Sequence, residues 1–307
     1  MENIFNDDNK NIFNDAPFSV VDTYGEDLTK KEYITNPAIA RESEIKKLII
    51  VLLTPEKSGL LVGKPGIGKT AIVEGLAYLI QRNEVPDALK GYRIIKFNST
   101  SLVGNINING RNEMIMNVFV DELKKMNKVI VFIDEIHTLI GARDSGPMDL
   151  ANMLKPALDR GEVKAIGATT TIEYDTYVIR DRAFLRRFEK IEVVEPDQPT
   201  TVKILLGSLR KIEKQTGIKF KYNDYVASQL IESIVSATSE FKRIYGLSAM
   251  YPDIAFSVLT QSFSHALFNN KKEVDILDVY NAIKTSKRIY PDSIVKELTA
   301  FREKFKK

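Results

Sequence analysis

The stretch GLLVGKPGIGKT (residues 59–70) decides the fold of this 307-residue chain. It fits the pattern G-x-x-x-x-G-K-[S/T] of a phosphate-binding loop, with a short apolar strand before it and a helical pattern after it. Glycines let backbone N–H groups close around phosphate oxygens, and the following helix N-terminus adds its positive end. Lys69 is expected to reach the β- and γ-phosphates, and the Thr70 hydroxyl is expected to bind Mg²⁺. The expected nucleotide contacts of this segment are Gly63, Pro65, Gly66, Ile67, Gly68, Lys69, Thr70 and Ala71.

Two carboxylates follow an apolar strand in VIVFIDE (residues 129–135). The carboxyl edge of a parallel sheet is where such sheets bind ligands, so both side chains are candidates for the same site. Asp134 is expected to hold Mg²⁺ through its water shell, and Glu135 to orient and deprotonate the attacking water. A solvated acidic turn is the alternative, and the upstream phosphate-binding loop favours the functional interpretation.

Two weaker signals come later in the chain. Thr170 follows a strand in GATT (167–170), where a hydroxyl could bond the γ-phosphate or the attacking water. Arg186 and Arg187 could stabilise the charge of a transferring phosphoryl group. From the residues alone, an ordinary strand end and a surface salt bridge are the better interpretations of these two signals.

Composition excludes several classes of function. Lys and Arg number 44 against 41 Asp and Glu, so the net charge of +3 gives no reason to expect a nucleic-acid partner. The absence of cysteine excludes disulfides and thiolate chemistry, and two histidines are too few for a His-rich zinc site. No apolar run approaches the roughly 18 residues that span a bilayer, and the N-terminus does not read as a signal peptide. We expect a soluble cytoplasmic protein with no membrane partner.

Three regions differ in pattern. Residues 1–22 are acidic and rich in Asn, and the pentapeptide NIFND occurs at 3–7 and again at 11–15. Low hydrophobicity predicts an unstructured tail, although a duplicated docking motif for a partner is the alternative. Residues 23–197 alternate strand and helix signals, which predicts an α/β domain with a parallel sheet. Residues 198–307 show only helical periodicity and predict a helical C-terminal domain.

The predicted elements can be given as ranges. Strands are expected at 59–63, 93–97, 129–133, 163–168 and 191–194, and helices at 41–53, 72–80, 111–127, 147–160, 199–215, 223–239, 252–268, 276–287 and 291–305.

The motifs, taken in order, resemble the first ATPase module of the Clp family of AAA+ proteins. The similar segments are YGEDLT (24–29), NPAIARESEI (36–45), TAIVEGLA (70–77), EVPDALKG (84–91), FIDEIHTLIGA (132–142), NMLKPALDRGE (152–162), GATT (167–170) and LRRFEKIEVVEP (185–196). The resemblance implies an αβα sandwich followed by a helical lid, with ATP between the two. It also implies a module that stands without the folded N-terminal domain, coiled-coil insertion or second ATPase module of its relatives.

The same resemblance implies roles for individual residues. Ile39 and Ala40 occupy the segment that packs on adenine, and Thr170 holds the sensor-1 position. Arg186 and Arg187 match paired arginine fingers that reach the ATP of a neighbouring subunit. Catalysis would therefore need a homo-oligomeric ring, by family habit a hexamer.

One segment departs from the family pattern. The loop that grips polypeptide in the central pore of such proteins carries an aromatic residue, and here the segment is NININGR (105–111), with Ile108 at the aromatic position. Isoleucine offers less contact area than tyrosine.

The first hypothesis is a ring ATPase that remodels or disassembles a protein partner, bound directly or through an adaptor that recognises the NIFND repeats. The alternative is a nucleotide-switched oligomeric scaffold or regulator, open to association with nucleic acid, with little or no threading.

Overall fold

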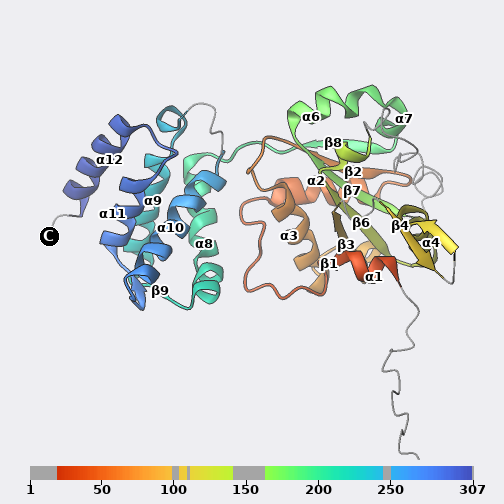
Figure 1. Cartoon of the computed structure of the whole chain (residues 1–307), viewed down its shortest axis with the longest axis horizontal. Coiled ribbons are helices and arrows are strands. Elements are labelled where there is room, and N and C mark those ends of the chain that lie inside the picture. The colour runs from red at the N-terminus through yellow and green to blue at the C-terminus, as the bar shows by residue number, and fades with distance from the viewer. Residues whose placement is uncertain (1–18, 99–103, 109–110, 141–162, 245–249, 306–307) are drawn as a thin grey trace, which may run out of the picture.

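The chain forms a sheet-containing unit and a helical unit, which lie side by side in a computed structural model (Figure 1). The structure describes residues 19–98, 104–108, 111–140, 163–244 and 250–305. The helices of the second unit are blue and cyan in Figure 1, and the sheet lies on the other side.

Six strands form the main sheet, in the order β1-β3-β6-β7-β2-β8. Every neighbouring pair is parallel except β1 with β3. The central strands β2 and β6 are buried on both faces, and their sequences are accordingly almost continuous apolar runs. The strands are β1 (Gly25–Asp27), β2 (Ser58–Val62), β3 (Arg93–Asn98), β6 (Val129–Asp134), β7 (Lys164–Thr169) and β8 (Phe188–Glu192).

Helices cover both faces of this sheet. One face packs against α2 (Glu42–Leu53) and α3 (Lys69–Gln81) through a core that includes Leu61, Ile130 and Phe132. The other face carries α1 (Val20–Tyr24), α4 (Ile115–Lys125), α6 (Thr171–Thr176) and α7 (Arg182–Leu185). The short 3₁₀ helices η1 (Asp87–Leu89), η3 (Ile136–Leu139) and η4 (Val178–Arg180) complete this unit. The fold is therefore the predicted αβα sandwich.

The helical unit has its own core. It contains α8 (Gln198–Thr216), α9 (Asp224–Ala237), η5 (Glu240–Lys242), α10 (Asp253–Phe268), α11 (Ile276–Thr285) and α12 (Pro291–Lys304). A short parallel pair joins β9 (Lys219–Phe220) to β10 (Glu273–Val274). Fully buried side chains such as Leu230, Leu259 and Val279 hold the helices together. The five predicted helices all occur within two residues of their expected ends.

Several expectations are corrected. The predicted helix 111–127 begins only at Ile115, because residues 111–114 form β5, which pairs antiparallel with β4 (Asn105–Ile108). The predicted strand 191–194 lies earlier, at Phe188–Glu192, where its backbone pairs with β2. The predicted helix 147–160 lies outside the described residues.

The predicted unstructured tail is wrong at its end. Val20 and Val21 are 0% and 2% exposed, so residues 19–22 belong to the folded unit. The backbone N–H groups of both valines donate to the carboxylate of Glu122 on α4, at 3.0 and 2.9 Å, and this fixes α1 against α4. The NIFND repeats lie outside the described residues.

The change from sheet to helices falls between Glu192 and Gln198. Asp197 caps α8 by accepting a hydrogen bond from the Thr200 backbone over 2.8 Å. We therefore propose residue 197 as the domain boundary. Among the described residues, no helix is both long and apolar enough to cross a membrane.

Candidate nucleotide-binding site

The phosphate-binding loop joins the carboxyl end of β2 to the start of α3. Gly66 and Gly68 have φ angles of 77° and 95°, a region that residues with a Cβ rarely adopt. Ile67 between them is buried, and its carbonyl accepts a hydrogen bond of 2.7 Å from the Arg41 guanidinium. Glycine geometry and this buried arginine thus shape the loop, while Pro65 lies exposed on its outer side.

Lys69 is the first residue of α3, and its ammonium points back over the loop. Its Nζ donates to the carbonyls of Gly63 and Lys64 at 2.8 and 3.2 Å. Burial lowers the pKa of Lys69, and the nearby carboxylates of Asp134, Glu173 and Glu135 oppose that shift. The ammonium therefore lies where a triphosphate would replace two carbonyls as its partner.

Thr70 and Asp134 meet although they lie on different elements. The Thr70 hydroxyl donates to Oδ2 of Asp134 over 3.1 Å, since α3 starts beside the end of β6. A hydroxyl and a carboxylate side by side are hard oxygen donors of the kind that Mg²⁺ prefers, usually together with phosphate oxygens and waters. These two residues therefore fit the predicted metal.

Glu135 follows in a left-handed backbone conformation, with φ 52° and ψ 45°. Such a conformation is uncommon for a residue with a side chain, and it turns the chain sharply between β6 and η3. The Glu135 side chain is exposed, as a base that must reach a water molecule requires.

The end of β7 carries a polar cluster next to this carboxylate. Thr170 caps α6: its hydroxyl accepts from the Glu173 backbone at 3.3 Å, and the Glu173 carboxylate accepts from the Thr170 backbone at 3.0 Å. Nδ1 of His137 lies 3.1 Å from the Thr169 hydroxyl and 3.2 Å from Glu173. Burial alone would raise the pKa of Glu173, but the hydrogen bonds from Thr170 and the positive potential of His137 hold it below its usual value. The cluster thus places an ionised carboxylate and the predicted sensor threonine near Lys69.

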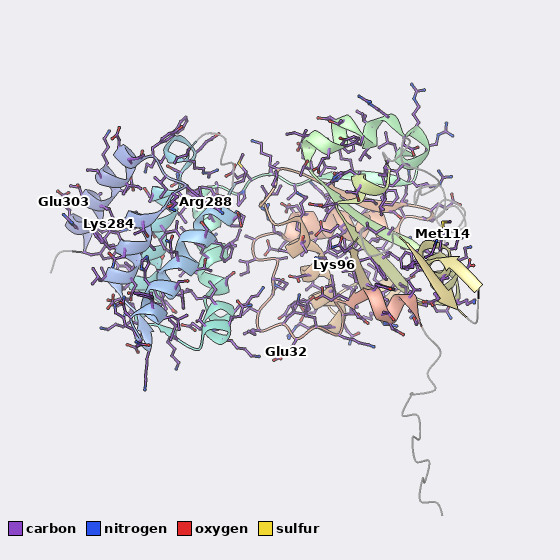
Figure 2. All side chains as sticks on the ribbon, viewed as in Figure 1. Glu32, Lys96, Met114, Lys284, Arg288 and Glu303 are labelled. Carbon is purple, nitrogen blue, oxygen red and sulfur yellow. The ribbon has the colours of Figure 1, made fainter. Side chains whose placement is uncertain are left out.

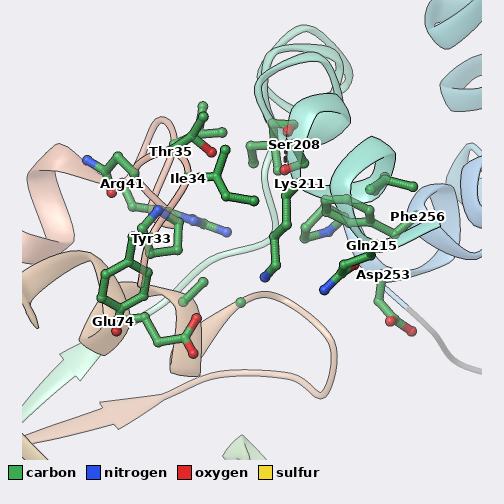
Figure 3. Close-up of a pocket in the computed structure, with 18 of the residues that line it drawn as sticks. Tyr33, Ile34, Thr35, Arg41, Glu74, Ser208, Lys211, Gln215, Asp253 and Phe256 are labelled. Atoms are coloured by element: carbon green, nitrogen blue, oxygen red, sulfur yellow. Dashed lines mark hydrogen bonds between the residues drawn. The ribbon is translucent and has the colours of Figure 1, made fainter. Parts of the chain in front are cut away.

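A cavity of about 730 Å³ opens beside the loop, between the two units. Its walls include Ile39, Gly66, Ile67, Gly68 and Ala71 from the predicted nucleotide set. Figure 3 shows Tyr33 and Glu74 on the sheet side, opposite Lys211, Gln215 and Asp253 from the lid helices. The volume and the mixed apolar and polar walls suit a ligand of nucleotide size.

Ile39 contacts Gly207 of the lid at one side of this cavity. A Cβ at Gly207 of α8 would lie only 2.4 Å from Cδ1 of Ile39, so a larger residue there would force the Ile39 side chain to move. Ala40, with φ 56°, turns the chain into α2 directly after Ile39. The predicted adenine segment therefore lines the cavity at the junction of sheet and lid.

Arg186 and Arg187 lie away from this site. The Arg187 carbonyl accepts from the backbone of Ser58, which starts β2, while the phosphate-binding loop follows the other end of that strand. Lys57 donates to the Arg186 carbonyl over 2.8 Å, and Phe184 and Phe188 stack at 4.0 Å between ring centroids on either side of the pair. The backbone of both arginines thus lies at the end of β2 that is opposite to the phosphate-binding loop.

Sequence reasoning missed several residues that shape the site. Arg41 and Glu173 gave no functional signal, although Thr170-x-x-Glu173 has the spacing of a capping box. Asp253 of the lid lies close to the loop, because a Cβ at Gly66 would lie 2.8 Å from its Cβ. Lys96 on β3 was also missed, and its Nζ lies 3.6 Å from Oδ2 of Asp134.

Comparisons with known proteins give a family match over most of the sheet-containing unit. Residues 59–196 match the model of the ATPase family associated with various cellular activities (AAA). Chaperone protein ClpB of Corynebacterium efficiens is 36% identical over 273 residues, which cover 86% of this chain and 31% of the relative. A probable ATP-dependent Clp protease ATP-binding subunit of Chlamydia pneumoniae is 35% identical over 274 residues, covering 88% of this chain and 31% of the relative.

A solved structure shows the same likeness. The S. cerevisiae Hsp104:casein complex in its extended conformation has a TM-score of 0.70 and 34% identity, over 84% of this chain and 43% of that chain. This chain thus spans about a third of the length of its curated relatives.

Fold and loop together define a P-loop nucleotide-binding fold, an αβα sandwich followed by a helical lid. Residues 59–196 of the chain match the AAA ATPase family. Within that family it is similar to the Clp and Hsp104 chaperones over most of its length.

Proposed function

We propose that this chain binds ATP with Mg²⁺ between its sheet and lid and hydrolyses it as one subunit of a homo-oligomeric ring, by analogy a hexamer. The observation that carries the proposal is the hydrogen bond between Thr70 and Asp134 beside Lys69. Residues far apart in the chain come together there, in the arrangement that phosphoryl transfer needs.

Each residue of the site has a separate proposed role in ATP binding or hydrolysis. Lys69 exchanges its two carbonyl partners for the β- and γ-phosphates, and Thr70 and Asp134 hold Mg²⁺. The metal would neutralise charge on the phosphate oxygens. Glu135 accepts a proton from the attacking water, and Thr170 orients that water or the γ-phosphate. The polar cluster around Glu173 fixes Thr170 in place.

Arg186 and Arg187 complete the site of the neighbouring subunit. Their position at the opposite end of β2 from the phosphate-binding loop supports a role in trans. An isolated subunit would then bind ATP but hydrolyse it slowly, because the charge that develops on the phosphoryl group lacks its arginine partners.

The partner of such a ring is proposed to be a protein that the ring remodels or disassembles. Similarity to the ClpB and Hsp104 chaperones supports this class of partner. The NIFND repeats are the proposed attachment point for an adaptor.

A specific observation favours the alternative, a nucleotide-switched scaffold with little threading. Residues 105–108 and 111–114, where the family has its pore loop, form a β-hairpin in which Ile108 pairs with Arg111. The hairpin carries alternating Asn and Ile in place of an aromatic residue, which reduces the grip available for a polypeptide.

Three measurements test these proposals. Lys69→Ala should abolish nucleotide binding, whereas Glu135→Gln should keep binding and stop turnover, because an amide cannot accept the proton. Glu84→Gln removes an exposed carboxylate elsewhere and should hydrolyse ATP at the wild-type rate. Wild-type turnover by Glu135→Gln would refute its assignment as the base.

Light scattering of Glu135→Gln with ATP then measures ring formation, and casein tests threading. Strong stimulation of wild-type ATP hydrolysis by unfolded casein, together with its unfolding or release, would favour remodelling. A ring whose ATP hydrolysis does not change with casein, and which does not unfold it, would favour the scaffold.

A further inference from the structure

A second lysine reaches the metal-binding carboxylate from the neighbouring strand. Nζ of Lys96 lies 3.6 Å from Oδ2 of Asp134, the same oxygen that accepts the Thr70 hydroxyl at 3.1 Å. Figure 2 labels Lys96 within the sheet-containing unit. The proposed mechanism leaves this ammonium without a role.

The register of the sheet fixes this contact. Lys96 pairs with Phe132, and Asn98 pairs with Asp134, between the parallel strands β3 and β6. Since side chains alternate along a strand, Lys96, Phe132 and Asp134 point to the same face, the one that α3 covers. Nζ lies 5.8 Å from the centre of the Phe132 ring, so the lysine stem runs along an apolar surface towards the carboxyl edge. Two rigid strands, not a surface loop, thus place the ammonium.

The charges at this edge are close together and only partly screened. The side chains of Lys96 and Asp134 are 28% and 31% exposed. The other oxygen of Asp134, Oδ1, accepts from the Glu135 backbone at 3.2 Å. A divalent cation that used Asp134 would stand within a few ångströms of the ammonium, and the two would repel each other.

We propose that Lys96 is the counter-ion of Asp134 before metal binds and competes there with Mg²⁺. It thereby sets the Mg²⁺ concentration at which the metal binds to Asp134 and Thr70. The inference rests on the metal site of the proposed function. With Mg²⁺ on Asp134 the ammonium would lose this partner, while β3 would still hold it at the sheet edge where the phosphate-binding loop begins. Lys96 therefore favours nucleotide binding without metal and opposes the binding of the metal itself.

Calorimetric titration with the slowly hydrolysed analogue ATPγS, at a series of free Mg²⁺ concentrations, tests this competition. Mg²⁺ is expected to increase the affinity for ATPγS. In Lys96→Met, the free Mg²⁺ concentration that gives half of this increase should fall about tenfold, the order expected for removing one close charge. In excess EDTA, the same variant should bind ATPγS several-fold more weakly than the wild type.

Two controls separate charge from structure. Lys96→Arg keeps the cation and should keep the wild-type Mg²⁺ dependence. Lys90→Met removes one positive charge beside Asp87, far from Asp134 in the sequence, and should also behave as the wild type. If Lys96→Met does not fold, as judged by circular dichroism, Lys96→Gln carries the same expectation with a polar side chain.

The outcomes are distinguishable. If Mg²⁺ tightens binding equally in the wild type and in the neutral variants, the competition is refuted and the proposed metal site stands. If Mg²⁺ does not tighten binding in the wild type at all, both the proposed metal site and the inference fail.

Discussion

Replacing Arg41 by alanine should destabilise the phosphate-binding loop, because it removes the hydrogen bond to the Ile67 carbonyl. The Arg41 guanidinium donates to three oxygens: Glu44 Oε1 at 2.8 Å, the Ile67 carbonyl at 2.7 Å and the Val194 carbonyl at 3.1 Å. The side chains of Arg41 and Glu44 are only 6% and 10% exposed. Alanine would leave the Glu44 carboxylate buried with only the Ser43 hydroxyl, at 2.7 Å, among its present side-chain donors.

The expected loss of stability follows from this geometry. Breaking a buried ion pair by removing one partner costs about 3–5 kcal/mol, because the remaining charge keeps its desolvation penalty. Part of that energy orders the loop, since Ile67 lies between Gly66 and Gly68. If about 1.4 kcal/mol of it does so, the affinity for ATP falls about tenfold.

The effect should depend on pH. Burial raises the pKa of Glu44, but hydrogen bonds from Ser43, its own backbone and Arg41, together with the charge of Arg41, outweigh burial and hold the pKa below its ordinary value of 4.5. A carboxyl whose pKa is lower in the folded state contributes stability above its unfolded pKa and loses that contribution as pH falls. The difference between wild type and Arg41→Ala should therefore shrink below about pH 4.5.

Urea unfolding followed by circular dichroism, with calorimetric titration of ATPγS, measures both effects. Arg41→Lys keeps one charge but cannot reach three acceptors as a planar fork. Its stability and its affinity for ATPγS should therefore lie between those of the wild type and Arg41→Ala. Arg82→Ala removes an exposed arginine, which pairs with Glu84, and should match the wild type in both assays. An Arg41→Ala protein within about 1 kcal/mol of wild type and with unchanged affinity would refute the reasoning, because the penalty for a buried unpaired charge would be missing.

Three further expectations follow from the site. Arg186→Ala or Arg187→Ala should keep ATP affinity and lower turnover by about a thousandfold or more. Mixing either variant with Lys69→Ala subunits should partly restore turnover. Absence of this rescue in rings shown to contain both variants would contradict a role in trans. Gly207→Val should weaken ATPγS binding by displacing Ile39, whereas Gly217→Ala, with nothing within 4 Å of its Cβ, should test only the strain of a positive φ. Glu173→Ala should lower kcat more than it raises the Kd for ATPγS, and equal changes in both would indicate only a loss of folding around Thr170.

The contiguous parts of the site could be predicted from the sequence. Residues 59–70 and 129–135 each combine an apolar strand with the loop or polar residues that follow it, so local pattern alone places them at one sheet edge. Arg41 and Lys96 could not be found in this way. Arg41 contacts residues 26 and 153 positions away in the chain, and Lys96 depends on the register of two strands.

The errors in secondary structure have a related cause. Residues 111–127 carry helical periodicity, but their first four pair with β4 in a hairpin. The residues between the two strands are Asn109-Gly110, a pair that favours two-residue hairpin turns, and this signal competes with the helical pattern. The pairing of β4 with β5 decided between the turn signal and the helical pattern.

Around the cavity the lid contacts the sheet-containing unit at Glu32, which pairs with Lys214 over 2.9 Å, at Thr35 and at Gly66, and none of these contacts lies where a γ-phosphate would bind. The Thr35 hydroxyl donates to the Gly207 carbonyl over 3.4 Å near Ile39, and Asp253 lies against Gly66. Lys69 and Asp134 lie at the other end of the loop, outside the cavity walls.

A ligand shifts a conformational equilibrium only through contacts that differ between the two states. The lid should therefore respond mainly to whether any adenine nucleotide is bound. The difference between ATP and ADP should be sensed instead through Thr170, Glu135 and the arginines of a neighbouring subunit. ADP should then close the lid as ATP does, while only ATP strengthens the contact between subunits. A lid that closed with ATP but not with ADP, measured by the distance between spin labels on α9 and α4, would show that the phosphate end controls it directly.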